Sequence, residues 1–361
     1  MAEATVMKPK TPEPKPTEPR WNLPASGTLY ALAVDGATGC AYVGGSAGTI
    51  YTCDLNAATP ALRPRMHDDA YVAALEVLRD GPQSGRLVAA RYDGSLVWYD
   101  LHDGKRLRIT TAHDGWIRDL CVVGDGRRLA TVGHDMRVKV WEAAEGKLVR
   151  SFVGHALETP QGYVSAIYAV AGSPDGRYVA SADRVGEVRV WDITSGKEAA
   201  RFCASEFYTF DVEKRDRSIG GIRRIRFSPD GKRLALAGIG QITNVDGFVG
   251  PSRLEVWDWQ TGKRAASLQD SHQAVLNDVL WSSDGRKLTA AGGGDGGGVL
   301  MVWDAAGKQP EQKLKFKGHA QRLARLDGGS LLLAAGFEGV QAWDERAWST
   351  SASANATKMA S

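Results

Sequence analysis

Residues 173–192 read SPDGRYVASADRVGEVRVWD, and this stretch decides the fold. It opens on a Ser-Pro-Asp-Gly turn, in which proline presets φ and glycine tolerates a positive φ, as a hairpin between short strands requires. In the run Glu187–Trp191, Val188 and Val190 point to one side and their neighbours to the other, which is the period of a strand. The run ends on the aromatic–acid pair Trp191-Asp192. Turn, strand and pair therefore form a unit that can be sought along the chain.

The aromatic–acid pair recurs with a regular spacing. Its seven copies, the first of them weaker, are Cys53-Asp54, Tyr99-Asp100, Trp141-Glu142, Trp191-Asp192, Trp257-Asp258, Trp303-Asp304 and Trp343-Asp344. The acids are separated by 46, 42, 50, 66, 46 and 40 residues. Most steps are close to the ~40–45 residues of a propeller blade of four strands. Histidines mark several repeat starts, at His67, His113, His155, His272 and His319.

A Gly-His pair, a Pro-Asp-Gly turn and a Trp-Asp pair together resemble the WD-repeat family, over about Trp21 to Trp348. The resemblance implies an all-β fold: a seven-bladed β-propeller of four-stranded antiparallel blades, with the ring closed by the N-terminal strand. Trp21–Leu23 is the candidate closing strand, and Glu345–Trp348 is its rival. The propeller is expected to span 21–348, between a disordered proline-rich tail at 1–20 and a disordered tail at 349–361.

The resemblance also implies a buried hydrogen-bond network in each blade, made by a His, a Ser or Thr, an Asp and the Trp. A buried polar group without a partner costs about 1–3 kcal/mol, so these side chains need one another. The third blade carries the full set, whereas Val185 takes the Asp position in the fourth. The network residues of these two blades are His113, Thr131, Asp135, Trp141, His155, Ser181 and Trp191.

The same residue types argue against catalysis. His113, Asp135 and a hydroxyl resemble a catalytic triad, but they recur once per blade, whereas an active site occurs once. The histidines belong to different blades, so we expect no metal site. The glycine run at 292–298 lacks the Gly-Lys-Ser/Thr of a phosphate loop. The sequence therefore predicts no enzyme, no cofactor and no metal.

Composition narrows the partner class. The 45 basic and 42 acidic residues give a net charge of only +3, which makes nucleic acid an unlikely ligand. No apolar run is long enough to cross a membrane. The four cysteines show no C-x-x-C spacing, and most lie in apolar strand-like runs. We expect reduced, buried thiols and a cytoplasmic protein.

Binding residues are expected on one face of the propeller. The loops that enter each blade and those between its second and third strands share that face, which is where family members usually bind partners. The long step into the fifth copy places two insertions there, at 204–220 and 238–251. Tyr, Trp and Arg are favoured in interface hot spots. The candidate partner-binding residues are Tyr71, Tyr92, Trp116, Arg118, His134, Tyr168, Phe207, Tyr208, Arg223 and Arg322.

The sequence thus predicts a non-catalytic protein- or peptide-binding scaffold that is monomeric by itself. Two alternatives stay open. The chain could be a structural subunit of a larger assembly, or an enzyme with convergent acids, histidines or a metal at the central channel. Ordinary solvated loop residues are the alternative explanation for each candidate binding residue.

Overall fold

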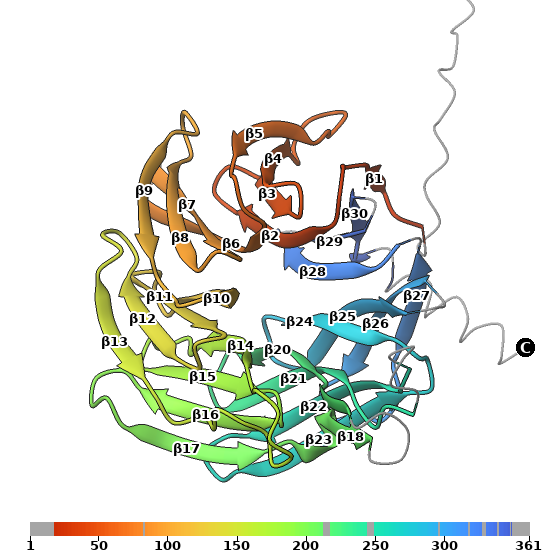
Figure 1. The fold of residues 1–361 in the computed structure, drawn as a ribbon. Helices are drawn as coiled ribbons and strands as arrows, with labels where there is room; N and C mark the ends of the chain where they lie inside the picture. Colours follow the sequence, from red (N-terminus) through yellow and green to blue (C-terminus); the bar gives the residue numbers. More distant parts are fainter. Residues whose placement is uncertain are drawn as a thin grey trace, which may run out of the picture.

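Seven four-stranded antiparallel sheets stand around a common axis in the computed structural model (Figure 1). The structure describes residues 18–348 except 82–83, 212–216, 244–248, 295–296, 317, 327–329, 338 and 347. The expected C-terminal tail and residues 1–17 of the expected N-terminal tail lie outside this part. The prediction of an all-β, seven-bladed propeller is confirmed.

The blades follow one another in chain order. Blade 1 contains β2 (Leu29–Asp35), β3 (Cys40–Gly45), β4 (Thr49–Asp54) and β5 (Arg63–His67); blade 2 contains β6 (Val72–Gly81), β7 (Ser84–Arg91), β8 (Ser95–Asp100) and β9 (Arg106–Thr111). Blade 3 contains β10 (Ile117–Val123), β11 (Arg128–Gly133), β12 (Val138–Glu142) and β13 (Leu148–Phe152); blade 4 contains β14 (Ile167–Gly172), β15 (Tyr178–Asp183), β16 (Glu187–Asp192) and β17 (Glu198–Cys203).

The remaining blades repeat the pattern, with one extra hairpin before blade 5. That insertion contains η1 (Ser205–Phe207), β18 (Tyr208–Asp211) and β19 (Arg217–Gly220). Blade 5 contains β20 (Ile222–Phe227), β21 (Arg233–Ile239), β22 (Ser252–Asp258) and β23 (Lys263–Asp270); blade 6 contains β24 (Val275–Trp281), β25 (Lys287–Gly294), β26 (Gly297–Asp304) and β27 (Gln312–Phe316). Blade 7 contains β28 (Ala320–Arg325), β29 (Leu331–Gly336), β30 (Gly339–Asp344) and β1 (Trp21–Leu23).

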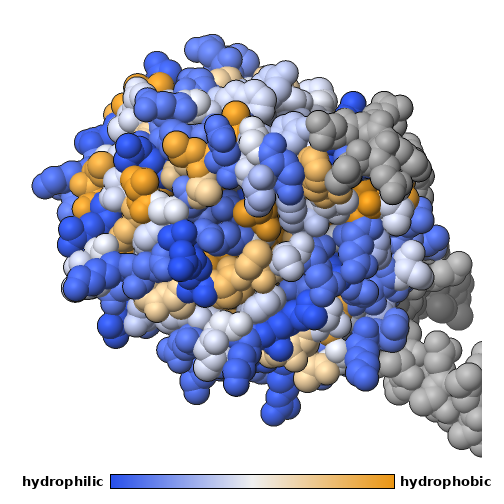
Figure 2. Space-filling model, turned by 60° about the horizontal axis from the view of Figure 1, so that its bottom comes forward, coloured by the Kyte–Doolittle hydropathy of each residue, from blue (hydrophilic) through white to orange (hydrophobic). Residues whose placement is uncertain are grey.

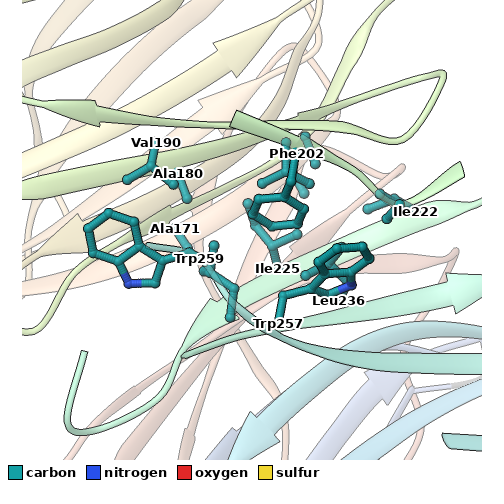
Figure 3. Close-up of a cluster of buried hydrophobic side chains, with 14 of the residues drawn as sticks. Ala171, Ala180, Val190, Phe202, Ile222, Ile225, Leu236, Trp257 and Trp259 are labelled. Atoms are coloured by element: carbon teal, nitrogen blue, oxygen red, sulfur yellow. The ribbon is translucent and has the colours of Figure 1, made fainter. Parts of the chain in front are cut away.

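The hydrophobic core lies between neighbouring blades rather than within one. Figure 3 shows this between blades 4 and 5, where side chains of the two sheets point toward one another. Phe202 of β17 stacks on Trp257 of β22 with ring centroids 4.6 Å apart. Ala180 and Leu236 are fully buried in the same cluster. Because each sheet buries both of its faces in this way, its middle strands are apolar on both sides.

The N-terminal strand closes the ring. β1 pairs antiparallel with β30, with Trp21 opposite Ala342 and Leu23 opposite Val340. The rival closing strand is wrong: Glu345 lies in a turn, and Trp348 is buried in the cluster between blades 6 and 7. The edge of β30 is already occupied by β1, so a second closing strand has no place to pair.

We expect Leu23→Asp to weaken the ring at this closure. Leu23 is 8% exposed and packs in a cluster with Leu29 and Leu331. The substitution removes apolar contacts and buries a carboxylate, so the free energy of unfolding should fall by about 3 kcal/mol or more. Asn22→Asp adds the same charge to the exposed neighbour in β1 and should change little. Urea unfolding followed by tryptophan fluorescence measures both, and equal stabilities would contradict the closure.

A β-bulge occurs at the same place in each of the seven innermost strands. Pairing with the next strand skips one residue, as between Ile117 and Asp119 of β10 or Ile222 and Arg224 of β20. A bulge leaves the skipped residue outside the ladder and re-aims its side chain. The seven skipped residues are Tyr30, Ala73, Arg118, Tyr168, Arg223, Asn277 and Gln321. We call this ring the channel mouth.

On the side drawn in Figure 2, hydrophobic residues occur in small groups separated by hydrophilic ones. Among the described residues, no helix has both the length and the hydropathy needed to span a membrane.

All four cysteines are free; Cys53 and Cys121 are buried, but Cys203 is exposed, which the sequence did not predict. Cys203 is exposed because it ends β17, the outermost strand of blade 4.

Candidate binding site at the channel mouth

The seven bulge residues surround a small cavity at one end of the central channel. The cavity has a volume of about 110 Å³ and is lined by Tyr30, Ala73, Tyr92, Arg118, Tyr168, Arg223, Asn277, Gln321 and Arg322. Three of these residues are arginines and none is a carboxylate. Bulges at equivalent positions therefore convert seven strand ends into one polar, positively charged ring.

A continuous row of aromatic rings leads away from the cavity, and we call Tyr71, Tyr92, Trp116 and His134 the aromatic row. Tyr92 stacks on Trp116 with centroids 5.3 Å apart, and Tyr71 lies 5.7 Å from Tyr92. His134 lies 5.0 Å from Trp116 at the other end. Tyr71 is 49% exposed and Trp116 47% exposed, although both are large side chains that folding normally buries. The row is thus a preformed aromatic surface open to solvent.

Arg118 joins the aromatic row to the channel mouth. Its guanidinium lies 5.3 Å from the ring centroids of both Trp116 and Tyr168. Its Nε donates a hydrogen bond to Nε2 of His134 over 2.7 Å. Burial and the adjacent Arg118 charge lower the pKa of His134, so the imidazole is a neutral acceptor at pH 7. Arg223 contacts Tyr168 from the other side, at 5.7 Å.

Most of the sequence-predicted binding residues lie together here. Contacts link seven of them in one chain, which are Tyr71, Tyr92, Trp116, His134, Arg118, Tyr168 and Arg223. Arg322 lines the same cavity. Sequence reasoning missed Tyr30, Asn277 and Gln321, although the alignment of inner strands that selected Arg118, Tyr168 and Arg223 also aligns these three.

Two predicted binding residues do not join this group. Phe207 is 1% exposed and belongs to the core cluster between blades 4 and 5, so it offers no surface to a partner. Tyr208 begins β18, where its hydroxyl hydrogen-bonds with that of Ser218 at 2.9 Å. We expected the 204–220 insertion to lie at the binding site because it contains aromatic residues. In the structure, Phe207 instead anchors this insertion to the core.

Ion pairs also hold the insertion to blade 5. Glu206 pairs with Arg253, which is fully buried, and with Arg264 at 2.8 Å. The second insertion is tied to the first, because the amide of Ile242 donates to the Thr209 hydroxyl over 3.1 Å. Residues 212–216 and 244–248, at the centres of the two insertions, lie outside the described residues.

Inside the channel, below the mouth, one arginine pairs with two buried aspartates. Arg224 donates to Asp119 and, over 3.1 Å, to Asp278. Backbone amides satisfy the other oxygens, from Val170 to Asp119 over 3.1 Å and from Leu323 to Asp278 over 2.9 Å. Burial alone would raise the pKa of Asp278, but the surrounding arginines hold it below its usual value. We call Asp119, Arg224 and Asp278 the channel triad.

Two further groups border this triad. Nη2 of Arg322 lies 3.5 Å from Asp119, on the side toward the mouth. Glu76 of β6 lies on the channel wall, where burial raises the pKa of its carboxyl to about 7, against the charges of Arg226 and Arg224. Sequence reasoning missed this cluster, whose members come from five different blades.

The histidine of blade 3 takes part in a hydrogen-bond network inside the blade. In blade 3, His113 Nδ1 lies 2.8 Å from Asp135 and Nε2 lies 2.7 Å from the Thr131 hydroxyl. That hydroxyl accepts a hydrogen bond from the indole N–H of Trp141 over 2.9 Å. His113 is 2% exposed. Both of its nitrogens are therefore occupied and shielded from any substrate.

Blade 4 has a complete network too, and the expectation that Val185 leaves it without a carboxylate is wrong. His155 Nδ1 lies 2.9 Å from Asp183, and Nε2 lies 2.8 Å from Ser181, which accepts from Trp191 over 3.0 Å. Asp183 occupies the position of Gly133 in blade 3, where an added Cβ would lie 3.1 Å from the His113 ring. A side chain at this position thus reaches the histidine from the other side of the turn.

Ligand atoms of His155, Asp183 and Glu187 lie within 4.8 Å of one another, the spacing of a metal site. The fit is poor, because His155 Nδ1 faces Asp183 as a hydrogen-bond partner and Nε2 is bound to Ser181. A metal on Nδ1 would displace that hydrogen bond. The cluster is accounted for by the network of blade 4.

In blades 2, 5, 6 and 7, the buried polar side chains have other partners or none. In blade 2, Asp68 takes the histidine position and binds both Tyr99 and Arg91. In blade 5, Trp257 donates to Glu255 over 2.8 Å. The indole N–H groups of Trp303 and Trp343, in blades 6 and 7, have no hydrogen-bond partner among the described residues. The blades therefore differ in how fully their buried polar groups are satisfied.

Comparisons with known proteins agree with this architecture. The model of the WD domain, G-beta repeat family matches residues 104–142 and 146–192. The chain is 26% identical to telomerase protein component 1 of Rattus norvegicus over 74% of its length and to nuclear distribution protein PAC1 of Arthroderma otae over 66%. It is 28% identical to small ribosomal subunit protein RACK1y of Oryza sativa subsp. japonica over 54%.

The chain spans half or less of each of these relatives, with 9%, 50% and 49% of their lengths covered. The likeness therefore concerns a repeat domain that larger proteins share. The two matched repeats are blades 3 and 4, which are also the two with a complete network of histidine, hydroxyl, carboxylate and tryptophan. Blades 3 and 4 are thus WD repeats, and they belong to a seven-bladed β-propeller that is similar to WD-repeat proteins at the level of the family.

Proposed function

We propose that this chain is a non-catalytic scaffold that binds a protein or peptide on the face of the channel mouth. The observation that carries the proposal is the exposed aromatic row, continued by Arg118 into the cavity. Trp, Tyr and Arg are the side chains that contribute most to interface hot spots. Stacked rings also lose little side-chain freedom on binding, because their contacts already hold them in place.

The alternative of an enzyme at the central channel requires an ionisable cluster, and the channel contains one. Two of its three carboxylates are already bound, however. Asp119 and Asp278 are 0% and 1% exposed and accept hydrogen bonds from Arg224 and from backbone amides. Both oxygens of each of these two carboxylates accept hydrogen bonds, so the groups hold neighbouring strands together. This favours binding over catalysis at the channel.

Other hollows favour a ligand less. Two larger depressions, of about 490 and 450 Å³, lie where the inner strands end, opposite the mouth. Turn residues line them, such as Asp125 and Pro174 in one and Asn56 and Arg346 in the other. Neither contains stacked exposed rings. We therefore place the partner on the mouth side.

The proposal includes the setting in which the scaffold acts. We propose that residues 21–348 form the binding unit, that it is monomeric by itself, and that it works in the cytoplasm. Four free thiols fit a reducing compartment. The near balance of basic and acidic residues favours a protein over nucleic acid or a membrane surface.

Affinity capture with mass spectrometry tests the proposal. Trp116→Ala should reduce recovery of the captured partner at least tenfold, because an interface tryptophan is a typical hot spot. The melting temperature should be unchanged, since the side chain is half exposed. Ile109→Ala, which trims a 51% exposed residue on the outer strand of blade 2, is the matched control. Equal recovery with Trp116→Ala, or loss with Ile109→Ala, would refute the site.

A further inference from the structure

We propose that the channel mouth receives an acidic side chain of the bound peptide, with its carboxylate held by Arg118 and the neighbouring arginines. This rests on the proposed function, because it names the chemistry of the partner at that same site. A different set of observations supports it: the charge balance along the channel and the fixed position of Arg118.

The positive charge of Arg118 has no carboxylate partner among the described residues. The cavity lining includes Arg118, Arg223 and Arg322 and no carboxylate. Below it, Asp119 and Asp278 are already bound to Arg224, and Arg322 lies 3.5 Å from Asp119 at the edge of that group. No carboxylate of the described residues lies within 4.0 Å of Arg118. An anion entering from solvent would therefore supply the missing charge.

Burial, and secondly repulsion between like charges, disfavour the charged form of two of these arginines. Burial and the charge of Arg224 lower the pKa of Arg322, with Asp119 and Asp278 opposing. Burial lowers the pKa of Arg223, and Arg118 adds to the effect, although Tyr168 opposes it. Like charges in a desolvated site favour binding of a group of opposite charge. A lysine or arginine of a partner would meet the same repulsion.

Arg118 is fixed in a geometry that suits a carboxylate. Trp116 and Tyr168 both contact its guanidinium, and His134 accepts from its Nε. Its two terminal amino groups make no hydrogen bond to the described residues. The guanidinium fork matches a carboxylate in a bidentate arrangement, and fixing it beforehand reduces the entropy lost on binding.

The cavity selects by size as well. A volume of about 110 Å³ holds a few water molecules or the end of one side chain, not a folded element. Tyr71 and Trp116 extend the surface outside it. The geometry thus suits an extended peptide that places one Asp or Glu in the mouth and lays adjacent residues on the aromatic row.

Selection from a random heptapeptide library displayed on phage tests this with the full chain as bait. We expect enrichment of Asp or Glu at one position, next to an apolar or aromatic residue. The selected peptide, labelled with fluorescein, is then titrated by fluorescence polarisation. Its Kd should rise at least tenfold with Arg118→Gln and when the acidic residue is replaced by its amide. Arg127→Gln, at an exposed arginine on the opposite face of blade 3, is the control and should leave Kd unchanged.

The outcomes separate the two proposals. Enriched peptides without an acidic residue, or an acidic peptide that binds the Arg118→Gln variant equally well, overturn the acidic-side-chain proposal but leave the binding face standing. Failure to enrich any peptide, or binding that Trp116→Ala does not weaken, overturns the proposed function as well. A labelled oligonucleotide of random sequence that binds as tightly as the peptide overturns the assignment to a protein partner.

Discussion

Arg224→Ala should lower the free energy of unfolding by about 3–5 kcal/mol, because it leaves two buried carboxylates without their shared cation. Arg224 is 3% exposed and binds both Asp119 and Asp278, which belong to blades 3 and 6. Few single substitutions have so large an effect. Chemical unfolding of the variant and of Arg127→Ala, which trims an exposed arginine, measures the difference.

The same reasoning predicts a rescue. Alanine stands at the position equivalent to Arg224, directly after the bulge residue, in blades 1, 2 and 4, as Ala31, Ala74 and Ala169. Converting the whole channel triad and Arg322 to alanine removes the charges together. Replacing a whole set of paired buried charges by apolar residues is often nearly neutral, whereas removing one partner leaves an uncompensated charge. The quadruple variant should therefore be more stable than Arg224→Ala alone, and lower stability would contradict this account of the channel.

His113→Ala should destabilise the protein by about 3 kcal/mol, because it removes the partner of both Asp135 and Thr131 in blade 3. Each buried polar group left without a partner costs about 1–3 kcal/mol. His102→Ala, at an exposed histidine in the turn after β8, is the matched control and should stay within about 0.5 kcal/mol of the unmodified protein. Equal losses in the two variants would show that the network contributes nothing.

The same network makes stability depend on pH. Burial lowers the pKa of His113 against the opposing effect of Asp135, so below a pH of about 6.5 the unfolded chain binds the proton more readily. Burial alone would raise the pKa of Asp135, but His113 holds it at about 2, so its contribution disappears as the pH falls below about 4. Stability should therefore fall with pH on both counts. His113→Ala should flatten the profile between pH 7 and pH 3, and a parallel profile would contradict the assignment.

The propeller could be predicted from sequence because its signals are local and repeated. Each blade contains its own turn, alternating strands and aromatic–acid pair, so spacing alone reveals the count. Even the degenerate first blade, with Cys53 in the aromatic position, keeps its place in the ring. The sequence left two candidates for the closing strand. β1 and β30 lie at opposite ends of the propeller sequence, so only their pairing in the folded ring shows which candidate closes it.

What could not be predicted depends on contacts between distant residues. Arg224 and Asp119 are 105 residues apart, and nothing local indicates that their blades meet in the channel. The network of blade 4 was misjudged because Asp183 reaches His155 from two residues before the expected position. Phe207 was placed at the surface because an aromatic residue in an insertion does not reveal which way it points. The mouth was found only in part, since the bulges that aim Tyr30 and Asn277 into it are visible only in the pairing.

The central claim is that the partner binds at the channel mouth and the aromatic row. Backbone hydrogen exchange of the full chain, with and without a saturating captured partner or selected peptide, tests it most directly. We expect slower exchange around Tyr92, in the segment Asp114–Arg118 and at His134, with no change in the turns around Asp125 and Asp175 at the other end of the inner strands. Protection confined to those turns, or to the outer strands β9 and β13, would contradict the claim.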